Sequence, residues 1–361
     1  MSHEPGPARS AWPWLILLTL VVSISLLLHL AGLPSPVLFG ALAAGLAYAL
    51  VAPHPPTVPG FAFTAGQAVL GASIGSTLDP AALSSLQADW FPVILSCLAT
   101  LLLSVGAGYL LRLKSGISTA TGVFAMVAGG ASGIVAISRD LGADDRVVAV
   151  VQYLRVLIIL VGMPLVAQFV FRADPVADPV TGAAPGLTPE SAGTLREIGA
   201  GLALTALALV IGIPLARRIP LPAGALLFPL VVTASLTGTG LVDASVPGAL
   251  ESVGFALIGL QVGLRFTRAS LKAVAAVLPL AMLAIIGLIV ASAGLGVLLA
   301  RATGRSLLDG YLATTPGGLY AVLATAVGSG SDVTFVLTVQ IVRLFVMLFS
   351  APLLARFISR S

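Results

Sequence analysis

The chain has 361 residues, of which 58% are apolar and only 9% are charged, and its mean hydropathy is +1.09. Soluble domains carry about 25% charged residues, so this composition excludes a soluble enzyme, a disordered regulator and a disulfide-stabilised scaffold. The net charge of +4 comes from 18 basic residues scattered in ones and twos. Because no basic cluster could follow a phosphate backbone, the sequence predicts no nucleic-acid partner. What remains is an all-α polytopic membrane protein, since the apolar stretches run continuously for about 20 residues instead of alternating.

Six apolar stretches precede a polar, Pro-rich segment and six follow it. We therefore expect a membrane repeat over residues 12–171, a linker over 172–197 and a second membrane repeat over 198–357. No small-residue cleavage pattern follows the first stretch, so we expect it to be a retained helix and not a signal peptide. The stretches in chain order are Trp12–Leu30, Pro36–Val51, Phe61–Thr77, Phe91–Leu113, Thr119–Ser138 and Val147–Phe171, then Ile198–Leu215, Pro222–Leu236, Gly248–Leu264, Ala273–Ala300, Leu312–Val327 and Val333–Phe357.

The two sets of stretches are copies of one another. A constant shift of about 188 residues aligns residues 33–169 with residues 221–357 without a gap, and about 38 of the roughly 137 aligned pairs are identical. The identities are not confined to leucine: they include pairs of glycines, an aspartate, a glutamine and an arginine. The chain is therefore a tandem duplication.

Basic residues in short loops mark the cytoplasmic side of a membrane protein, and here they distinguish two topologies. With the N-terminus inside and all six stretches crossing, the repeats are parallel, and about nine basic residues lie inside against about seven outside. If the fifth stretch enters the membrane and returns, the repeats are inverted and about twelve basic residues lie inside. The charges thus predict two inverted repeats, each with about five transmembrane helices and one re-entrant or broken Gly-Gly element. The basic residues left outside are Arg172, Arg196, Arg301 and Arg305.

Each fifth stretch contains a glycine pair, and Pro316 precedes the second pair. Proline and paired glycines disfavour a continuous helix. Non-helical backbone at membrane depth must be buried in protein or line a cavity, where its polar groups can bind an ion or a solute. Close helix packing is the alternative role for these glycines. The candidate solute-binding residues in the two stretches are Gly129, Gly130, Ser132, Thr314, Thr315, Gly317 and Gly318.

Each sixth stretch carries a Gln-x-x-Arg motif whose two side chains share one helix face. An arginine inside the membrane is costly and requires an anion. A carboxylate of the solute is one candidate, and Asp144 or Asp332 of the opposite repeat is the other, because Asp144 lies about 16 Å from Arg155 within one helix. We therefore assign Asp144 and Asp332 as ion-pair or coupling residues. The residues added to the solute-binding set are Gln152, Arg155, Gln340 and Arg343.

The residue types that hold metals are sparse. Cys97 is the single cysteine, and His3, His29 and His54 are widely separated in the sequence. This set provides neither a disulfide framework nor a metal centre. We expect no cofactor and no enzymatic activity.

The duplicated motifs resemble the AbrB family of bacterial membrane proteins, from about residue 12 to residue 357: Leu-Pro near the second stretch, spaced glycines in the third, Gly-Gly in the fifth and Gln-x-x-Arg in the sixth. Members of that family are also labelled ammonia monooxygenases or transcriptional regulators. Ala128 departs from the family pattern, which has a proline before the glycine pair, whereas Pro316 keeps it. The chain lacks a ligand set for an oxygenase metal cluster, and nothing in it resembles the small DNA-binding fold that shares the AbrB name.

The duplicated architecture also looks like the cation/proton antiporter and anion transporter superfamily, whose glutamate and hydroxycarboxylate carriers place glycine-rich re-entrant loops at the substrate site. These resemblances imply a multi-pass protein of the bacterial inner membrane that acts as a secondary transporter of a small, anionic solute. Its partners would be the lipid bilayer and the solute, with a homo-oligomer left open. The alternative is a non-transporting membrane protein involved in regulation of gene expression.

Overall fold

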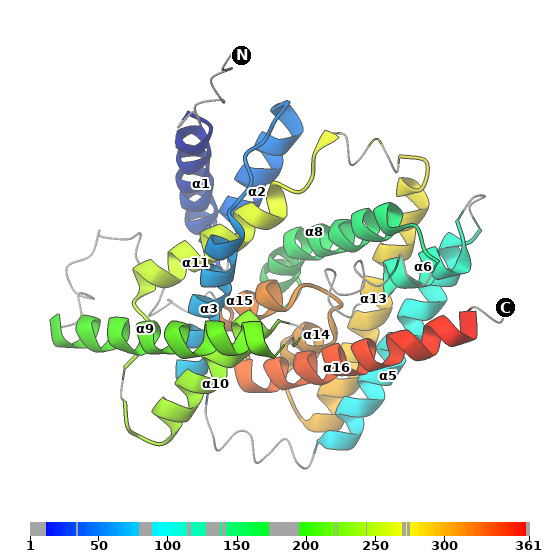
Figure 1. Cartoon of the computed structure of the whole chain (residues 1–361). Helices are drawn as coiled ribbons and strands as arrows, with labels where there is room; N and C mark the ends of the chain where they lie inside the picture. The colour runs from blue at the N-terminus through cyan, green and yellow to red at the C-terminus, as the bar shows by residue number, and fades with distance from the viewer. Residues whose placement is uncertain are drawn as a thin grey trace.

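A computed structural model describes residues 12–33, 35–78, 89–113, 117–127, 138, 142–172, 195–219, 221, 223–242, 244–268, 272 and 275–358. Within these residues the chain forms thirteen helices and no strand (Figure 1). The fold class is therefore all-α, as the composition predicts. The helices are α1 (Trp12–Leu30), α2 (Pro36–Val51), α3 (Gly60–Thr77), α5 (Trp90–Leu111), α6 (Thr119–Met126), α8 (Asp145–Phe169), α9 (Leu195–Arg218), α10 (Gly224–Gly238), α11 (Gly248–Gly263), α13 (Leu278–Thr303), α14 (Leu307–Thr314), α15 (Leu319–Gly328) and α16 (Val333–Ile358).

The duplication is visible in where helices begin. The starts of α2, α3, α6 and α8 recur after the same shift as the starts of α10, α11, α14 and α16. The residues that precede helices recur as well. Ser35 and Ala223, at aligned positions before α2 and α10, both adopt left-handed backbone angles, with φ of 51° and 56°. Ser118 and Ser306 cap α6 and α14 through their side chains, which satisfies backbone N–H groups that a helix start leaves free.

Six of the helices are long and apolar enough to cross a membrane. Their outer faces carry large apolar side chains exposed to the surroundings, such as Leu102 at 70% and Leu283 at 68%. A soluble protein would bury such side chains, whereas a lipid-facing surface requires them. The chain is therefore a membrane-type helical protein. The six helices are α1, α5, α8, α9, α13 and α16, and the shorter apolar ones include α2, α10 and α11.

The two repeats contact one another reciprocally. A Cβ atom added to Gly66 in α3 would lie 3.2 Å from the carbonyl oxygen of Gly254 in α11, and a Cβ added to Gly254 would lie 3.2 Å from the carbonyl oxygen of Gly66. These two glycines are aligned by the duplication. Such reciprocity is the property of a two-fold related interface. The aligned crossings of α3 with α10 and of α2 with α11 behave alike, Gly71 lying against the backbone of Leu226 and Gly259 against that of Leu38.

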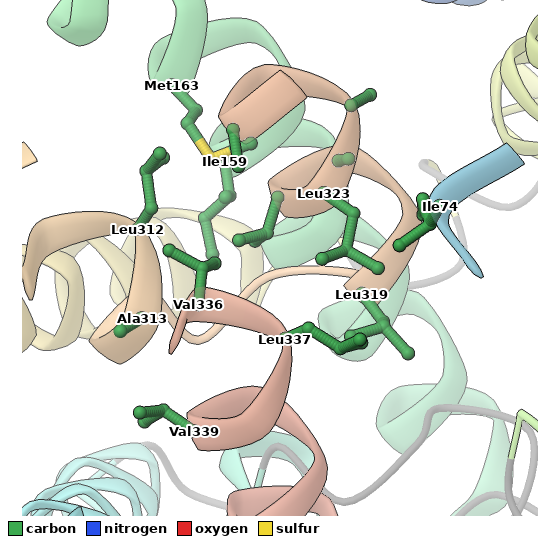
Figure 2. Packing of buried hydrophobic residues seen from close by; sticks show 14 of the residues in the cluster. Ile74, Ile159, Met163, Leu312, Ala313, Leu319, Leu323, Val336, Leu337 and Val339 are labelled. Atoms are coloured by element: carbon green, nitrogen blue, oxygen red, sulfur yellow. The ribbon is translucent and has the colours of Figure 1, made fainter. Parts of the chain in front are cut away.

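The helices form two groups around a common seam. In Figure 1, helices α1, α2, α3, α9, α10 and α11 lie together on one side, and α5, α6, α13, α14 and α16 lie together on the other. Helices α8 and α15 lie at the seam, since α8 contacts α11 and α15 contacts α3. Figure 2 shows the apolar core there: Ile159 and Met163 of α8 approach Leu312 of α14 and Leu323 of α15, with Ile74 of α3 nearby.

Candidate functional site at the interrupted helices

The fifth element of the second repeat is interrupted, as its Pro-Gly-Gly sequence predicts. Helix α14 ends at Thr314 and α15 begins at Leu319. Thr315 has φ of −58° and ψ of 121°, an extended conformation that proline imposes on the residue before it. Gly318 is also extended, with φ of −71° and ψ of 131°. Four residues of non-helical backbone therefore lie between two short helices.

This element folds back on itself. The backbone N–H of Asp332, just before α16, donates to Oδ1 of Asp309 in the first turn of α14, at 2.8 Å. The start of α14 and the start of α16 thus lie together, although α15 intervenes in sequence. Eight residues of α14 extend about 12 Å. The element is therefore a hairpin of two short helices, α14 and α15.

The first repeat shows the same entry. The backbone N–H of Asp144, the residue before α8, donates to Oγ1 of Thr121 in the first turn of α6, at 2.9 Å. Thr121 is aligned with Asp309, and Asp144 with Asp332. Helix α6 ends at Met126, and Val127 follows in an extended conformation. The predicted site residues Gly129, Gly130 and Ser132 lie outside the described residues.

The Gln-x-x-Arg motif of the second repeat caps the end of α14. The amide nitrogen of Gln340 donates to the carbonyl oxygens of Leu312 at 2.8 Å, Ala313 at 3.2 Å and Thr315 at 3.3 Å. The guanidinium of Arg343 donates to the carbonyls of Thr314 at 3.2 Å and Thr315 at 2.7 Å, and also to the amide oxygen of Gln340. The motif therefore satisfies the carbonyl groups that the last turn of a helix leaves without partners.

The motif of the first repeat does the same for α6. Gln152 donates to the carbonyls of Phe124 at 2.7 Å and Val127 at 2.8 Å. Arg155 donates to the carbonyl of Met126 at 2.7 Å and to the amide oxygen of Gln152 at 2.6 Å. The ends of α6 and α14 are thus closed by the same two types of side chain.

Neither arginine reaches the aspartates that we assigned as its alternative partners. Asp144 instead caps α8, accepting from the backbone N–H groups of Arg146 and Val147. Asp332 caps α16 and forms an ion pair with Arg305 at the mouth of the hairpin. Each aspartate precedes the first turn of its own helix, about 16 Å from the arginine of the same repeat. Its carboxylate caps that helix and is therefore not paired with the arginine of the opposite repeat.

Both guanidinium groups keep a free donor. Arg155 is 3% exposed and Arg343 is 4% exposed, and the Nε of each has no hydrogen-bond partner among the described residues. A buried charged donor without an acceptor is costly, and an anion would stabilise each of the two guanidinium groups.

The second interruption packs against the helix that carries Arg155. A Cβ added to Gly317 would lie 2.7 Å from Cγ2 of Ile159, and one added to Gly318 would lie 3.6 Å from Cγ1 of Val156. Ile159 and Val156 are in α8, on the turn after Arg155. Gly317 therefore permits the close approach of the two elements, and the structure brings Gly317 and Gly318 against α8, the helix that carries the motif of the opposite repeat.

The threonine hydroxyls at the second interruption are occupied within the protein. Thr314 donates to the carbonyl of Ser292 at 2.8 Å, and Thr315 donates to that of Tyr311 at 2.6 Å. The backbone carbonyls of both threonines accept hydrogen bonds from Arg343, so both residues contribute to the site with their main chain and not with their side chains. Ser292 and its aligned partner Ser104 are fully buried, and their hydroxyls have no partner among the described residues.

Two residues of this region lie outside the site predicted from the sequence. Gln67 in α3 donates its amide N–H to the hydroxyl of Tyr320, the second residue of α15. The ring of Phe63 meets the Tyr320 ring edge-on, with centroids 6.4 Å apart. Tyr320 follows Gly317-Gly318 closely in sequence, which is the signal that could have identified it. Gln67 gives no such signal, because it lies in a glycine-rich face that also suits packing.

Duplicated helices, buried charges and the interruption between α14 and α15 define a class, that of membrane-type helical proteins built from two repeats. A family model described as "Transition state regulatory protein AbrB" matches residues 37–359, and the chain belongs to this AbrB family. It is 33% identical over 351 residues to "Putative regulator AbrB" of Escherichia coli (strain K12), covering 96% of each chain. It is 27% identical over 296 residues to "Uncharacterized protein YhjN" of Bacillus subtilis (strain 168), covering 80% of this chain and 76% of that protein.

Proposed function

We propose that this AbrB-family protein is a secondary transporter that moves a small anionic solute across the bacterial inner membrane. The solute binds between the two helix interruptions. The observation that supports this most directly is the pair of buried arginines, Arg155 and Arg343, each with an unpartnered Nε among the described residues. The proposal involves no catalytic step, no cofactor and no nucleic acid, and its partners are the bilayer and the solute.

A charge balance supports an anion. Two guanidinium groups contribute two positive charges, and the two helix C-termini that they cap contribute about half a negative charge each. About one positive charge is left over in a dehydrated setting, where no carboxylate of the described residues pairs with Arg155 or Arg343. A carboxylate or phosphate-type group of a solute would remove this imbalance.

The topology that goes with this proposal is an inverted repeat. If each hairpin returns to its own side, each repeat crosses the membrane five times, and the second repeat begins on the opposite side from the first. The two hairpins then enter from opposite sides and meet near the middle of the bilayer, where secondary transporters bind their solutes.

The decisive experiment is uptake by proteoliposomes. Purified protein is reconstituted and offered a panel of radiolabelled organic acids, with a neutral sugar as the control solute. We expect uptake of at least one acid, and its loss in the variant Arg343→Gln. No uptake of any acid by folded protein, together with no thermal stabilisation by any of them, would reject the proposal.

The printed name of the Escherichia coli relative, a regulator, favours a second candidate. In that case the chain would be a non-transporting membrane protein that influences gene expression through a partner. A deletion strain separates the two, because its transcript changes can be complemented with wild-type protein or with Arg343→Gln. Complementation by the variant would favour regulation without transport, whereas complementation by the wild type alone would make any regulation a consequence of solute movement.

A further inference from the structure

The ends of interrupted membrane helices are natural cation sites. Backbone carbonyls there lack helical partners and carry the negative end of the helix dipole. In secondary transporters such carbonyls help to coordinate Na⁺. In this chain, however, the carbonyls at both helix ends already have donors.

The occupation is dense at both ends. At α14 the carbonyls of four consecutive residues, 312–315, accept hydrogen bonds from Gln340 or Arg343. At α6 the carbonyls of Phe124, Met126 and Val127 accept from Gln152 or Arg155. A metal cation at either end would have to displace a charged, fully buried side chain.

We propose that Arg155 and Arg343 are built-in counter-cations: each guanidinium occupies the carbonyl site that a monovalent metal cation would otherwise take at the end of α6 or α14. The planar fork of arginine suits this role, because NH1 addresses the carbonyls while NH2 is held by the glutamine one turn away. The charge is therefore fixed in the protein and does not arrive with an ion from solution.

A consequence follows for the solute. Na⁺ and K⁺ are not needed to assemble the two helix ends, so anion binding needs neither ion. This consequence concerns the proposed transport function and rests on it. The position of the guanidinium groups at the helix ends does not depend on that function.

The test measures thermal stability of the purified full-length protein in equal concentrations of NaCl, KCl and choline chloride, without solute. Wild-type protein should melt at the same temperature in all three salts. The variant Arg343→Ala leaves the carbonyls of Thr314 and Thr315 without their cation, so Na⁺ or K⁺ should raise its melting temperature in a saturable manner relative to choline. Arg301→Ala, which removes an exposed arginine from the last turn of α13, is the matched control and should stay indifferent to the cation.

Two further variants keep the inference open to contradiction if Arg343→Ala does not fold. Arg343→Lys retains a positive charge at the helix end and should be indifferent to the salt, and Arg155→Ala repeats the experiment at α6. Saturable stabilisation of the wild type by Na⁺ or K⁺ would overturn the inference, as would folded alanine variants that remain indifferent to all three salts.

The inference and the proposed function fail in different ways. Uptake of an organic acid that strictly requires Na⁺ would contradict the cation-independent site and leave anion transport standing. Absence of uptake would contradict transport and leave the salt-dependence of melting as the measure of the guanidinium role.

Discussion

A guanidinium at a helix C-terminus is only partly neutralised, and this sets the energetics of the site. Hydrogen bonds to charged groups contribute about 1.5–3 kcal/mol each. Arg343 makes such bonds to the carbonyls of Thr314 and Thr315 and to Gln340. Its Nε has no acceptor among the described residues. The residue thus stabilises the hairpin and keeps binding capacity for an anion.

Arg343→Gln should therefore have two effects. Loss of the charged donor leaves buried carbonyls unsatisfied, so the unfolding free energy should fall by about 3 kcal/mol. Anion binding should be lost as well, which separates the residue from a purely structural cap. Thermal melting and acid-dependent stabilisation measure the two effects, with Arg301→Gln as the exposed control. Retained anion binding in a folded Arg343→Gln variant would remove this arginine from the site.

A double variant tests where the counter-charge lies. Because Asp332 pairs with Arg305 and not with Arg343, Asp332→Asn should not rescue Arg343→Gln, and the two losses in stability should add within about 0.5 kcal/mol. Melting temperatures of both single variants and the double variant provide the measurement. Recovery of stability in the double variant would show that the aspartate and Arg343 are coupled after all.

For single residues, the sequence predicted which arginines would be buried but not which groups would accept their hydrogen bonds. A charged residue within an apolar stretch can be recognised from the sequence alone, and because a buried charge is costly, it is expected to have a negative partner. The partner here is the summed partial charge of several carbonyls at a helix end, so no acidic residue marks it. Depth along the helix was enough to disfavour Asp144 as a partner of Arg155, but the capping geometry required the fold.

The interrupted element shows which glycine matters and why. Gly318 adopts φ of −71° and ψ of 131°, a conformation open to any residue, and a Cβ there would make ordinary contact with Val156. Gly317 is different, because its Cβ would lie 2.7 Å from Ile159. The sequence predicted the interruption from Pro316 and the glycine pair. The division of roles within the pair depends on an approach by α8 that no local pattern contains.

Gly317→Leu should therefore separate α15 from α8, whereas Gly318→Ala should be tolerated. Overpacking of this kind costs about 1–3 kcal/mol, and the displaced hairpin should lose solute uptake. Gly106→Leu is the control, since no atom other than those of its chain neighbours and its own helix backbone lies within 4 Å of a Cβ at that position. Melting temperature and uptake of the three variants give the comparison. Equal effects of Gly317→Leu and Gly106→Leu on melting temperature and uptake would mean that the close contact between Gly317 and α8 is not required for function.

The whole molecule is organised by the duplication. Identity between the repeats predicted that the two halves share one fold, and the glycine faces of α3 and α11 predicted close packing. That Gly66 and Gly254 would pack on each other was beyond the sequence, because two aligned residues touch only when they lie near a two-fold axis. The direction of that axis relative to the membrane determines whether the repeats are inverted.

The direction of the axis can be tested by asking on which side of the membrane two aligned positions lie, one in each repeat. Leu113 follows α5 and Arg301 closes α13 at the equivalent position of the second repeat. In the inverted arrangement they lie on opposite sides of the membrane, and in a parallel arrangement they lie on the same side. Basic residues favour the first case, with Arg112 cytoplasmic and Arg301 periplasmic. Both cysteine variants are made on a Cys97→Ser background and treated with a membrane-impermeant thiol reagent. In intact spheroplasts we expect the reagent to label Arg301→Cys and not Leu113→Cys. In inside-out vesicles we expect it to label Leu113→Cys and not Arg301→Cys. Thr188→Cys in the linker should follow Arg301→Cys. Labelling of Leu113→Cys and Arg301→Cys from the same side would rule out inverted repeats and require both hairpins to enter from one face.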